Sequence, residues 1–193
     1  MRRTREQAAA TRSRIIETAS RLFRERGING IGLSDLMVDA GLTHGGFYKH
    51  FASKEALVAE ACESAFARAK DEADRRAAKV SDEDALAAMV GDYLSPLHRD
   101  HCGQGCAIAA LGSEAARGDG VVKAALDRGI EMFRERIAQQ ARRSGVANVD
   151  EFANAAASAM VGGLMLARLA RDPNDSEAIL RNTKEFILQA AKR

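Results

Sequence analysis

The chain has 193 residues, of which 46% are hydrophobic and 29% charged, so it can bury a substantial core and has the balance of a soluble, cytosolic protein. The N-terminus lacks the apolar region of a secretory signal, and the longest apolar run, residues 155–167, is too short to span a bilayer, so we expect neither secretion nor membrane association. The net charge of +2 combines ten Lys and Arg against five acidic residues in residues 1–54 with a mildly acidic remainder, which argues against a protein that coats DNA along its whole length.

The apolar residues recur with a helical period along the whole chain, and strand-forming runs of Val, Ile and Thr are missing. We therefore predict an all-α protein of about nine helices. A small N-terminal bundle of about three helices, residues 1–53, is expected to precede a larger helical bundle, residues 54–193. A long helix from about residue 54 to residue 78 should link the two parts.

The N-terminal helices have recognisable ends. The first carries an apolar stripe and ends at Gly27. Ser34 is expected to cap the second helix, which ends at Gly41. Thr43 should cap the third helix, and Ser53 the long fourth one.

The remaining helices form the second part. The fifth should begin near Ser81 and end at Ser95, because Pro96 disfavours helix in the residue before it. Residues 95–105 are then expected to form a loop, and the sixth helix begins near Gly105. The last three helices are placed at residues 122–144, at residues 152–169 and after Pro173.

The second and third helices are short, and "AGLTH", residues 40–44, joins them through a glycine turn and a threonine cap. This is a helix-turn-helix, whose second helix can lie in the major groove of DNA. Helical hairpins in ordinary bundles also contain glycine turns, so the spacing alone is a weak signal. Gly45 and Gly46 strengthen it, because glycine costs a helix about 1 kcal/mol relative to alanine and therefore indicates close approach to phosphates and base edges.

Polar side chains surround these two glycines. Phe47 and Phe51, four positions apart, are expected to fasten the third helix to the core and leave the polar residues facing outward. Lys54 opens the fourth helix, where its charge and the free backbone N–H groups favour a phosphate. The residues that we expect to contact DNA are Thr43, His44, Gly45, Tyr48, Lys49, His50 and Lys54.

Residues 14–58, "RIIETASRLFRERGINGIGLSDLMVDAGLTHGGFYKHFASKEALV", resemble the tetracycline-repressor (TetR) family of bacterial transcription regulators. The positions at which family members touch DNA correspond here to Thr43, Gly45, Tyr48, His50 and Lys54. His44 stands where relatives often have Arg, Pro or Lys, so no base preference follows. The resemblance implies a homodimer on a palindromic operator, usually a repressor that a small-molecule inducer releases.

The larger part contains a candidate dimer interface and a candidate ligand pocket. The eighth helix has a broad stripe of small and apolar residues, typical either of a monomer's core helix or of a two-fold interface, and the resemblance favours the interface. With the ninth helix, the expected interface residues are Ala153, Ala156, Ala157, Met160, Gly163, Leu164 and Phe186. One set of residues could line a pocket for an apolar or amphipathic inducer, or could simply form core. These residues are Phe66, Met89, Tyr93, Cys106, Leu111, Phe133 and Met160.

Three cysteines in a cytosolic-looking chain do not suggest a disulfide framework, and Cys62 on an apolar helical face indicates a packing residue. The segment "HRDHCGQGCAIAAL" is different, because His98, His101, Cys102 and Cys106 lie within nine positions. It permits a plain loop and helix cap, a thiol sensor of oxidants or electrophiles through Cys106 with Cys102 as a further possible redox residue, or a soft-metal site. "CxxxC" lacks paired zinc spacing, so we predict no metal or cofactor. "GCAIAALGSEAAR" also resembles one subgroup of the family, in which a cysteine at the position of Cys106 is common.

An enzyme is the competing function class. Cys102 and Cys106 would serve a thiol-disulfide enzyme, but such motifs usually sit beside a βαβ pattern, and none is present. The sequence also shows no Ser-His-Asp arrangement, phosphate-binding loop or carboxylate pair at a plausible site. We therefore expect no enzymatic activity, and we expect operator DNA, a second copy of the chain and a small inducer as partners.

Overall fold

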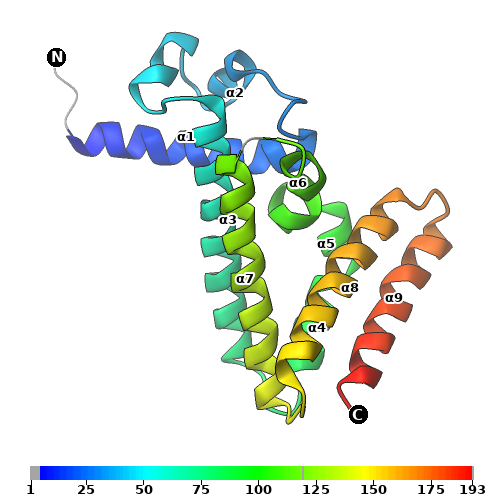
Figure 1. Cartoon of the computed structure of the whole chain (residues 1–193). Coiled ribbons are helices and arrows are strands. Elements are labelled where there is room, and N and C mark those ends of the chain that lie inside the picture. Colours follow the sequence, from blue (N-terminus) through cyan, green and yellow to red (C-terminus); the bar gives the residue numbers. More distant parts are fainter. Residues whose placement is uncertain (1–4, 119, 193) are drawn as a thin grey trace.

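The computed structural model describes residues 5–118 and 120–192 and shows an all-helical chain (Figure 1). Within these residues there are nine α-helices and two short 3-10 helices, η1 and η2, so the predicted fold class is confirmed. Their bounds are α1 (Arg5–Arg26), α2 (Leu33–Asp39), η1 (His44–Lys49), α3 (Lys54–Ala77), α4 (Ala85–Tyr93), α5 (Pro96–Asp100), η2 (Cys102–Gln104), α6 (Ala107–Ala115), α7 (Gly120–Arg143), α8 (Val149–Leu169) and α9 (Pro173–Ala190).

Several predicted ends are found where the sequence placed them. Gly27 and Gly41 follow α1 and α2 with φ of +79° and +69°, a left-handed conformation that glycine adopts without steric cost. The Ser53 hydroxyl accepts a hydrogen bond from the Ala56 N–H at 3.1 Å and so caps α3. Thr43 occupies the cap position before η1, but its side chain makes no cap hydrogen bond.

Other predicted boundaries are wrong. Gly32, not Ser34, precedes α2, and no side chain caps that helix. α4 begins at Ala85, because Ser81 instead closes a turn in which its hydroxyl accepts from the Asp84 N–H at 3.3 Å. The segment predicted as a loop contains α5, since proline is well tolerated at the first helical position and the Ser95 hydroxyl accepts from the His98 N–H at 3.2 Å.

Two pairs of long helices lie side by side in Figure 1, α3 with α7 and α8 with α9. A glycine permits close approach in each pair. A Cβ added to Gly129 of α7 would lie 2.1 Å from Cζ of Phe66 on α3, and one added to Gly163 of α8 would lie 2.9 Å from the Thr183 side chain on α9. Larger residues at these glycines would push the paired helices apart.

The apolar side chains form two clusters. The first joins α1, α2, η1 and α3 to α6 and the first turns of α7. The second is built mainly from α4, α7, α8 and α9. α6 and α7 therefore pack against the N-terminal helices as well as against the rest of the body.

α8 has the length and apolarity of a membrane-crossing helix, with a mean hydropathy of 1.3 over its most apolar window. It is the one such helix among the described residues, and 44% of that window is buried inside the chain. A core helix of a globular bundle has the same composition, so this property does not indicate a membrane.

Candidate nucleic-acid interface and its link to the body

The helix-turn-helix is formed by α2, the turn at Ala40–Thr43 and η1. The Leu42 N–H donates to the Met37 carbonyl oxygen at 2.8 Å and closes the turn behind Gly41. The expected third helix is a 3-10 helix of six residues rather than an α-helix. Two glycines in its first turn weaken an α-helix, which explains why only this short, tighter form is made.

Two aromatic rings anchor η1 to the core, as predicted from their spacing. Phe47 and Phe51 are buried and stack on each other with ring centroids 5.6 Å apart. The Arg12 guanidinium of α1 lies 4.7 Å from the centroid of the Phe51 ring and pairs with Glu60 of α3 at 2.6 Å. The segment of residues 44–51 is therefore held by α1 and α3 together.

The outer face of η1 carries the predicted polar groups. Tyr48 is 67% exposed, and Lys49 and Thr43 are also exposed. His50 is half-buried, and the side chain of His44 lies outside what the structure describes. A Cβ added to Gly45 would meet nothing within 4 Å, so folding of the chain does not require glycine there.

Lys54 makes an internal contact that the sequence did not suggest. Its ammonium group donates to the Ile31 carbonyl oxygen at 2.7 Å and lies 6.0 Å from the centroid of the Phe23 ring. Lys54 therefore ties the start of α3 to the residues that lead into α2. Its role as a phosphate ligand stays a prediction. The bond to Ile31 uses one of the three N–H donors of the ammonium group, so two are left for a phosphate.

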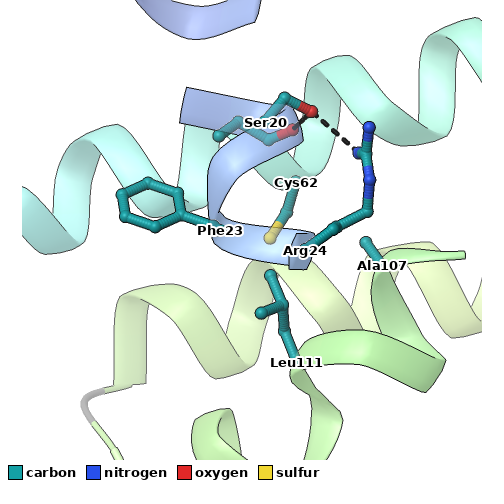
Figure 2. A pocket seen from close by; sticks show the side chains of 7 residues that line it. Ser20, Phe23, Arg24, Cys62, Ala107 and Leu111 are labelled. Carbon is teal, nitrogen blue, oxygen red and sulfur yellow. Dashed lines mark hydrogen bonds between the residues drawn. The ribbon is translucent and has the colours of Figure 1, made fainter. Parts of the chain in front are cut away.

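Arg24, in the last turn of α1, joins that helix to the cysteine segment. Its guanidinium donates twice to the Gly103 carbonyl oxygen, from Nε at 3.0 Å and from Nη2 at 2.5 Å. Nη1 donates to the Ser20 hydroxyl at 2.8 Å, the contact drawn in Figure 2. The Cys102 thiol donates back to the Arg24 carbonyl oxygen at 2.9 Å. We name these contacts the Arg24 connection.

The surroundings of the Arg24 connection are tightly packed. The hollow shown in Figure 2, which Phe23, Cys62 and Leu111 line, is too full to admit a water molecule. Burial lowers the pKa of the Arg24 guanidinium and raises the pKa of the Cys62 thiol to about 11, so Cys62 is a protonated packing residue at neutral pH. The cation stays charged because its ordinary pKa is so high.

Glu114 of α6 makes a second connection to the N-terminal helices. Its carboxylate accepts from the backbone N–H groups of Ile28, at 3.1 Å, and Asn29, at 3.2 Å. These groups follow the end of α1 and precede α2. The body thus holds both the last turn of α1 and the entry to the helix-turn-helix.

His98 is a structural group in this segment rather than a metal ligand. Its Nδ1 lies 2.7 Å from the Tyr93 carbonyl oxygen, and its Nε2 accepts from the Cys106 N–H at 2.9 Å. These partners require a neutral ring with the proton on Nδ1, and burial lowers the pKa of His98 accordingly. Among the residues that the structure describes, no group of three or more His, Cys, Asp or Glu side chains could hold a metal ion.

The structure separates the seven residues predicted to line one ligand pocket. Tyr93 stacks on Phe133 with centroids 5.1 Å apart, and both pack in the second cluster with Met89, Cys106 and Met160. Phe66 and Leu111 instead belong to the first cluster. The Tyr93 hydroxyl is buried, and burial together with the neighbouring Cys106 thiol raises the pKa of this phenol.

Six of the seven predicted interface residues lie inside the chain's own core and are closed to a partner. Phe186 alone of that set is largely exposed, at 65%. The buried six are Ala153, Ala156, Ala157, Met160, Gly163 and Leu164. The stripe of small residues on α8 packs against α7 and α9 of the same chain, so this part of the prediction is wrong.

Sequence reasoning missed the residues that link the two parts. Arg24 and Gly103 are 79 positions apart, and Glu114 is 86 positions from Ile28. Neither helical periodicity nor capping preference pairs such distant residues. The one available signal was the "CGQG" segment, whose glycines permit close approach: a Cβ on Gly103 would lie 2.3 Å from Oε1 of Glu25.

Comparison with known proteins gives two matches to family models. Residues 15–61 match "Bacterial regulatory proteins, tetR family", and residues 83–183 match "Tetracyclin repressor-like, C-terminal domain". The HTH-type transcriptional regulator TtgR of Pseudomonas putida is 47% identical over 58 residues, which are 30% of this chain but only 28% of TtgR. The HTH-type transcriptional repressor DhaR of a Mycobacterium species is 29% identical over 125 residues, 63% of this chain and 61% of DhaR.

Solved structures support the fold. The reduced form of E. coli NemR superimposes with a TM-score of 0.79 at 22% identity, covering 92% of this chain and 95% of NemR. A regulator from Saccharomonospora viridis in complex with choline gives a TM-score of 0.77 at 20% identity, covering 93% and 96% of the two chains. At these identities the comparison establishes a shared architecture only.

The His98 contacts predict a pH dependence of stability. The folded state favours the neutral ring, so its contribution is complete above the ordinary histidine pKa of about 6.5 and is lost as the pH falls from there through the lower folded value. Protonation places a donor against the Cys106 N–H, at a cost on the order of 1 kcal/mol. Urea unfolding of wild type and His98→Gln from pH 8 to pH 5 should show a difference that shrinks toward acid; a constant difference would contradict the assignment.

Proposed function

This chain belongs to the tetR family of bacterial regulatory proteins, and from that premise we propose that it binds a palindromic operator as a homodimer and represses transcription until a small molecule releases it. The observation that carries the proposal is the helix-turn-helix with an anchored base and an open polar face. The relative DhaR carries the name of a transcriptional repressor, which supports repression rather than activation. A regulator of this kind acts in the cytoplasm and needs no catalytic residue.

The DNA-binding proposal rests on the contrast between the two faces of η1. Phe47 is fully buried, whereas Tyr48 and Lys49 project from the opposite side, where a hydroxyl and an ammonium group can donate to phosphates or base edges. Gly45 is exposed and has free space around it, so its benefit lies outside the fold. A bare backbone lets η1 approach the groove more closely than any side chain would permit.

We propose that the two copies of the dimer meet at the face of α8 that is exposed in the single chain. Leu166 and Leu169 are 58% and 75% exposed near the end of α8, and Phe186 of α9 is 65% exposed. Ala155, Ser158 and Gly162 continue this face along α8 with the same helical spacing, and a Cβ on Gly162 would meet nothing within 4 Å. Exposed large apolar groups beside small ones suit close packing of two copies.

For the inducer, we propose an apolar or amphipathic small molecule, as expected from the apolar and aromatic residues of the body. The candidate region is the Tyr93–Phe133 stack beside Cys106, where a buried hydroxyl and a thiol would be the polar anchors in aromatic surroundings. The structural relative from S. viridis holds choline, which is consistent with a small ligand in this architecture.

A thiol-based switch is the second candidate, and one observation favours it. The Cys102 thiol donates directly to the Arg24 carbonyl oxygen, so a change at this sulfur acts on α1 itself. Cys102 and Cys106 are half-buried and free. Oxidation of Cys102 by a peroxide to a sulfenic acid would replace the S–H donor of the Arg24 connection with a bulkier S–O–H group.

The substitution Gly45→Ala tests whether Gly45 serves DNA binding rather than folding. Alanine favours helix by up to about 1 kcal/mol, so the melting temperature should stay the same or rise. Affinity for a duplex selected from a random-sequence library should fall at least tenfold, or about 1.4 kcal/mol, measured by fluorescence anisotropy at fixed salt. Gly112→Ala on α6 is the matched control, with its nearest neighbour at 4.0 Å, and should bind normally. Wild-type affinity in Gly45→Ala would refute the assigned role.

Leu166→Glu tests the open face of α8. A carboxylate at the centre of an apolar contact should shift the protein to monomers at micromolar concentration in analytical ultracentrifugation, with a matching loss of operator affinity. Val121→Glu on α7 is the control, because Val121 is similarly exposed at 57% but lies on another helix. An unaltered dimer in Leu166→Glu, or equal dissociation in both variants, places the interface elsewhere.

The thiol alternative makes a separate prediction. Titration with hydrogen peroxide should release wild type from the selected duplex, whereas Cys102→Ser or Cys106→Ser should resist, depending on which sulfur is oxidised. Mass spectrometry of the same samples identifies the modified residue. If wild type and both variants respond alike, the alternative is rejected and an ordinary ligand remains as the inducer.

A further inference from the structure

A hollow of about 280 Å³ opens where α5, the end of α8 and the start of α9 meet. Figure 1 shows these three elements together on the side of the molecule away from the N-terminus. Three of its lining residues are arginines, Arg99, Arg168 and Arg171. We name it the arginine hollow. It is distinct from the helix-turn-helix and from the aromatic region around Tyr93.

The positive charge of the arginine hollow is not matched by acids in its lining. Asp100 is the one acidic lining residue, and Arg99 already occupies both of its carboxylate oxygens, at 2.7 Å and 3.1 Å. Arg168 donates only to backbone carbonyl oxygens, those of Arg99 at 3.1 Å and His98 at 2.9 Å. Arg171 is exposed and has no hydrogen bond or ion pair within residues 5–118 and 120–192.

Two of the three arginines, Arg99 and Arg168, are held in place before any ligand binds. The Arg99 guanidinium donates to the hydroxyl of Ser176, which is 4% exposed and in turn donates to the Ala167 carbonyl oxygen. The two carbonyl contacts fix Arg168 in the same way. Fixed guanidinium groups lose little conformational entropy on binding, and their planar N–H pairs match the oxygens of a carboxylate or phosphate.

From the geometry we infer that the arginine hollow is a binding site for a small oxyanion, a carboxylate or a phosphate group. Three acidic residues stand near the hollow without lining it. Asp172 caps α9 by accepting from the Asn174 N–H at 2.7 Å, and Asp175 and Glu177 lie in the first turns of that helix. The pKa of Arg99 is raised by the hydrogen bond to the adjacent aspartate and, to a smaller extent, by the Glu177 charge.

Occupation of the hollow would reach the DNA-binding helices. Arg168 holds the carbonyl groups of His98 and Arg99, and the chain that follows them carries Cys102 and Gly103 of the Arg24 connection. An anion that binds the remaining N–H groups of Arg168 would act on these carbonyl contacts through the same guanidinium. This consequence rests on the proposed function, whereas the binding site itself does not.

Calorimetric titration of the full chain with inorganic phosphate and with succinate, at constant ionic strength, tests the site and distinguishes the two anion chemistries. Saturable binding of at least one probe is expected. Arg171→Gln removes a cation with no partner in the described fold, so it should fold normally and weaken binding at least fivefold. Arg181→Gln is the control, an exposed arginine of α9 outside the hollow, and should bind within twofold of wild type.

Two outcomes would overturn the site. One is the absence of saturable binding for both probes. The other is equal weakening in Arg171→Gln and Arg181→Gln, which would reduce the effect to general surface charge. Operator affinity measured with and without the bound probe tests the coupling separately: binding without any change in operator affinity removes the link to DNA and leaves the site standing.

Discussion

The paired hydrogen bonds from the Arg24 guanidinium to the Gly103 carbonyl oxygen connect α1, and through it the proposed DNA-binding helices, to the body. α1 carries the first core cluster, and η1 is anchored on α1 and α3 through Phe51, Arg12 and Glu60. We therefore expect a displacement of Gly103 to act on α1, and through α1 on the helix-turn-helix. The Glu114 carboxylate reinforces this coupling because it holds the backbone N–H groups that follow α1.

Close helix pairing makes the body that holds the Arg24 connection rigid. Gly129 against Phe66 and Gly163 against Thr183 leave no room between α3 and α7 or between α8 and α9. Packed interfaces of this kind shift between discrete arrangements rather than deforming continuously. A ligand or a modified thiol near residues 98–106 then changes operator occupancy if it favours the free arrangement over the DNA-bound one by a few kcal/mol.

Local signals in the sequence predicted the fold well, and failed where one residue permits two structures. Gly27, Gly41 and the Ser53 cap mark helix ends through backbone sterics and hydrogen bonding that depend on near neighbours alone. Pro96 predicts the end of a helix, but proline also suits the first turn of a helix, and α5 begins there. In the candidate site, the glycines and aromatic spacing of η1 predicted its two faces, whereas the internal bond of Lys54 to Ile31 was not visible.

The interface prediction failed for a different physical reason. α8 is apolar or small on two faces, so periodicity cannot say which face meets α7 and α9 and which meets a second copy. The Arg24 connection could not be predicted from the sequence, because its partners are brought together only by the complete helical packing.

Hydrogen exchange of the full chain, with and without the selected operator duplex, tests the Arg24 connection most directly. Residues 20–30 and 101–107 should gain protection together with residues 41–56 on operator binding; protection confined to residues 41–56 would contradict a mechanical link through Arg24 and Gly103.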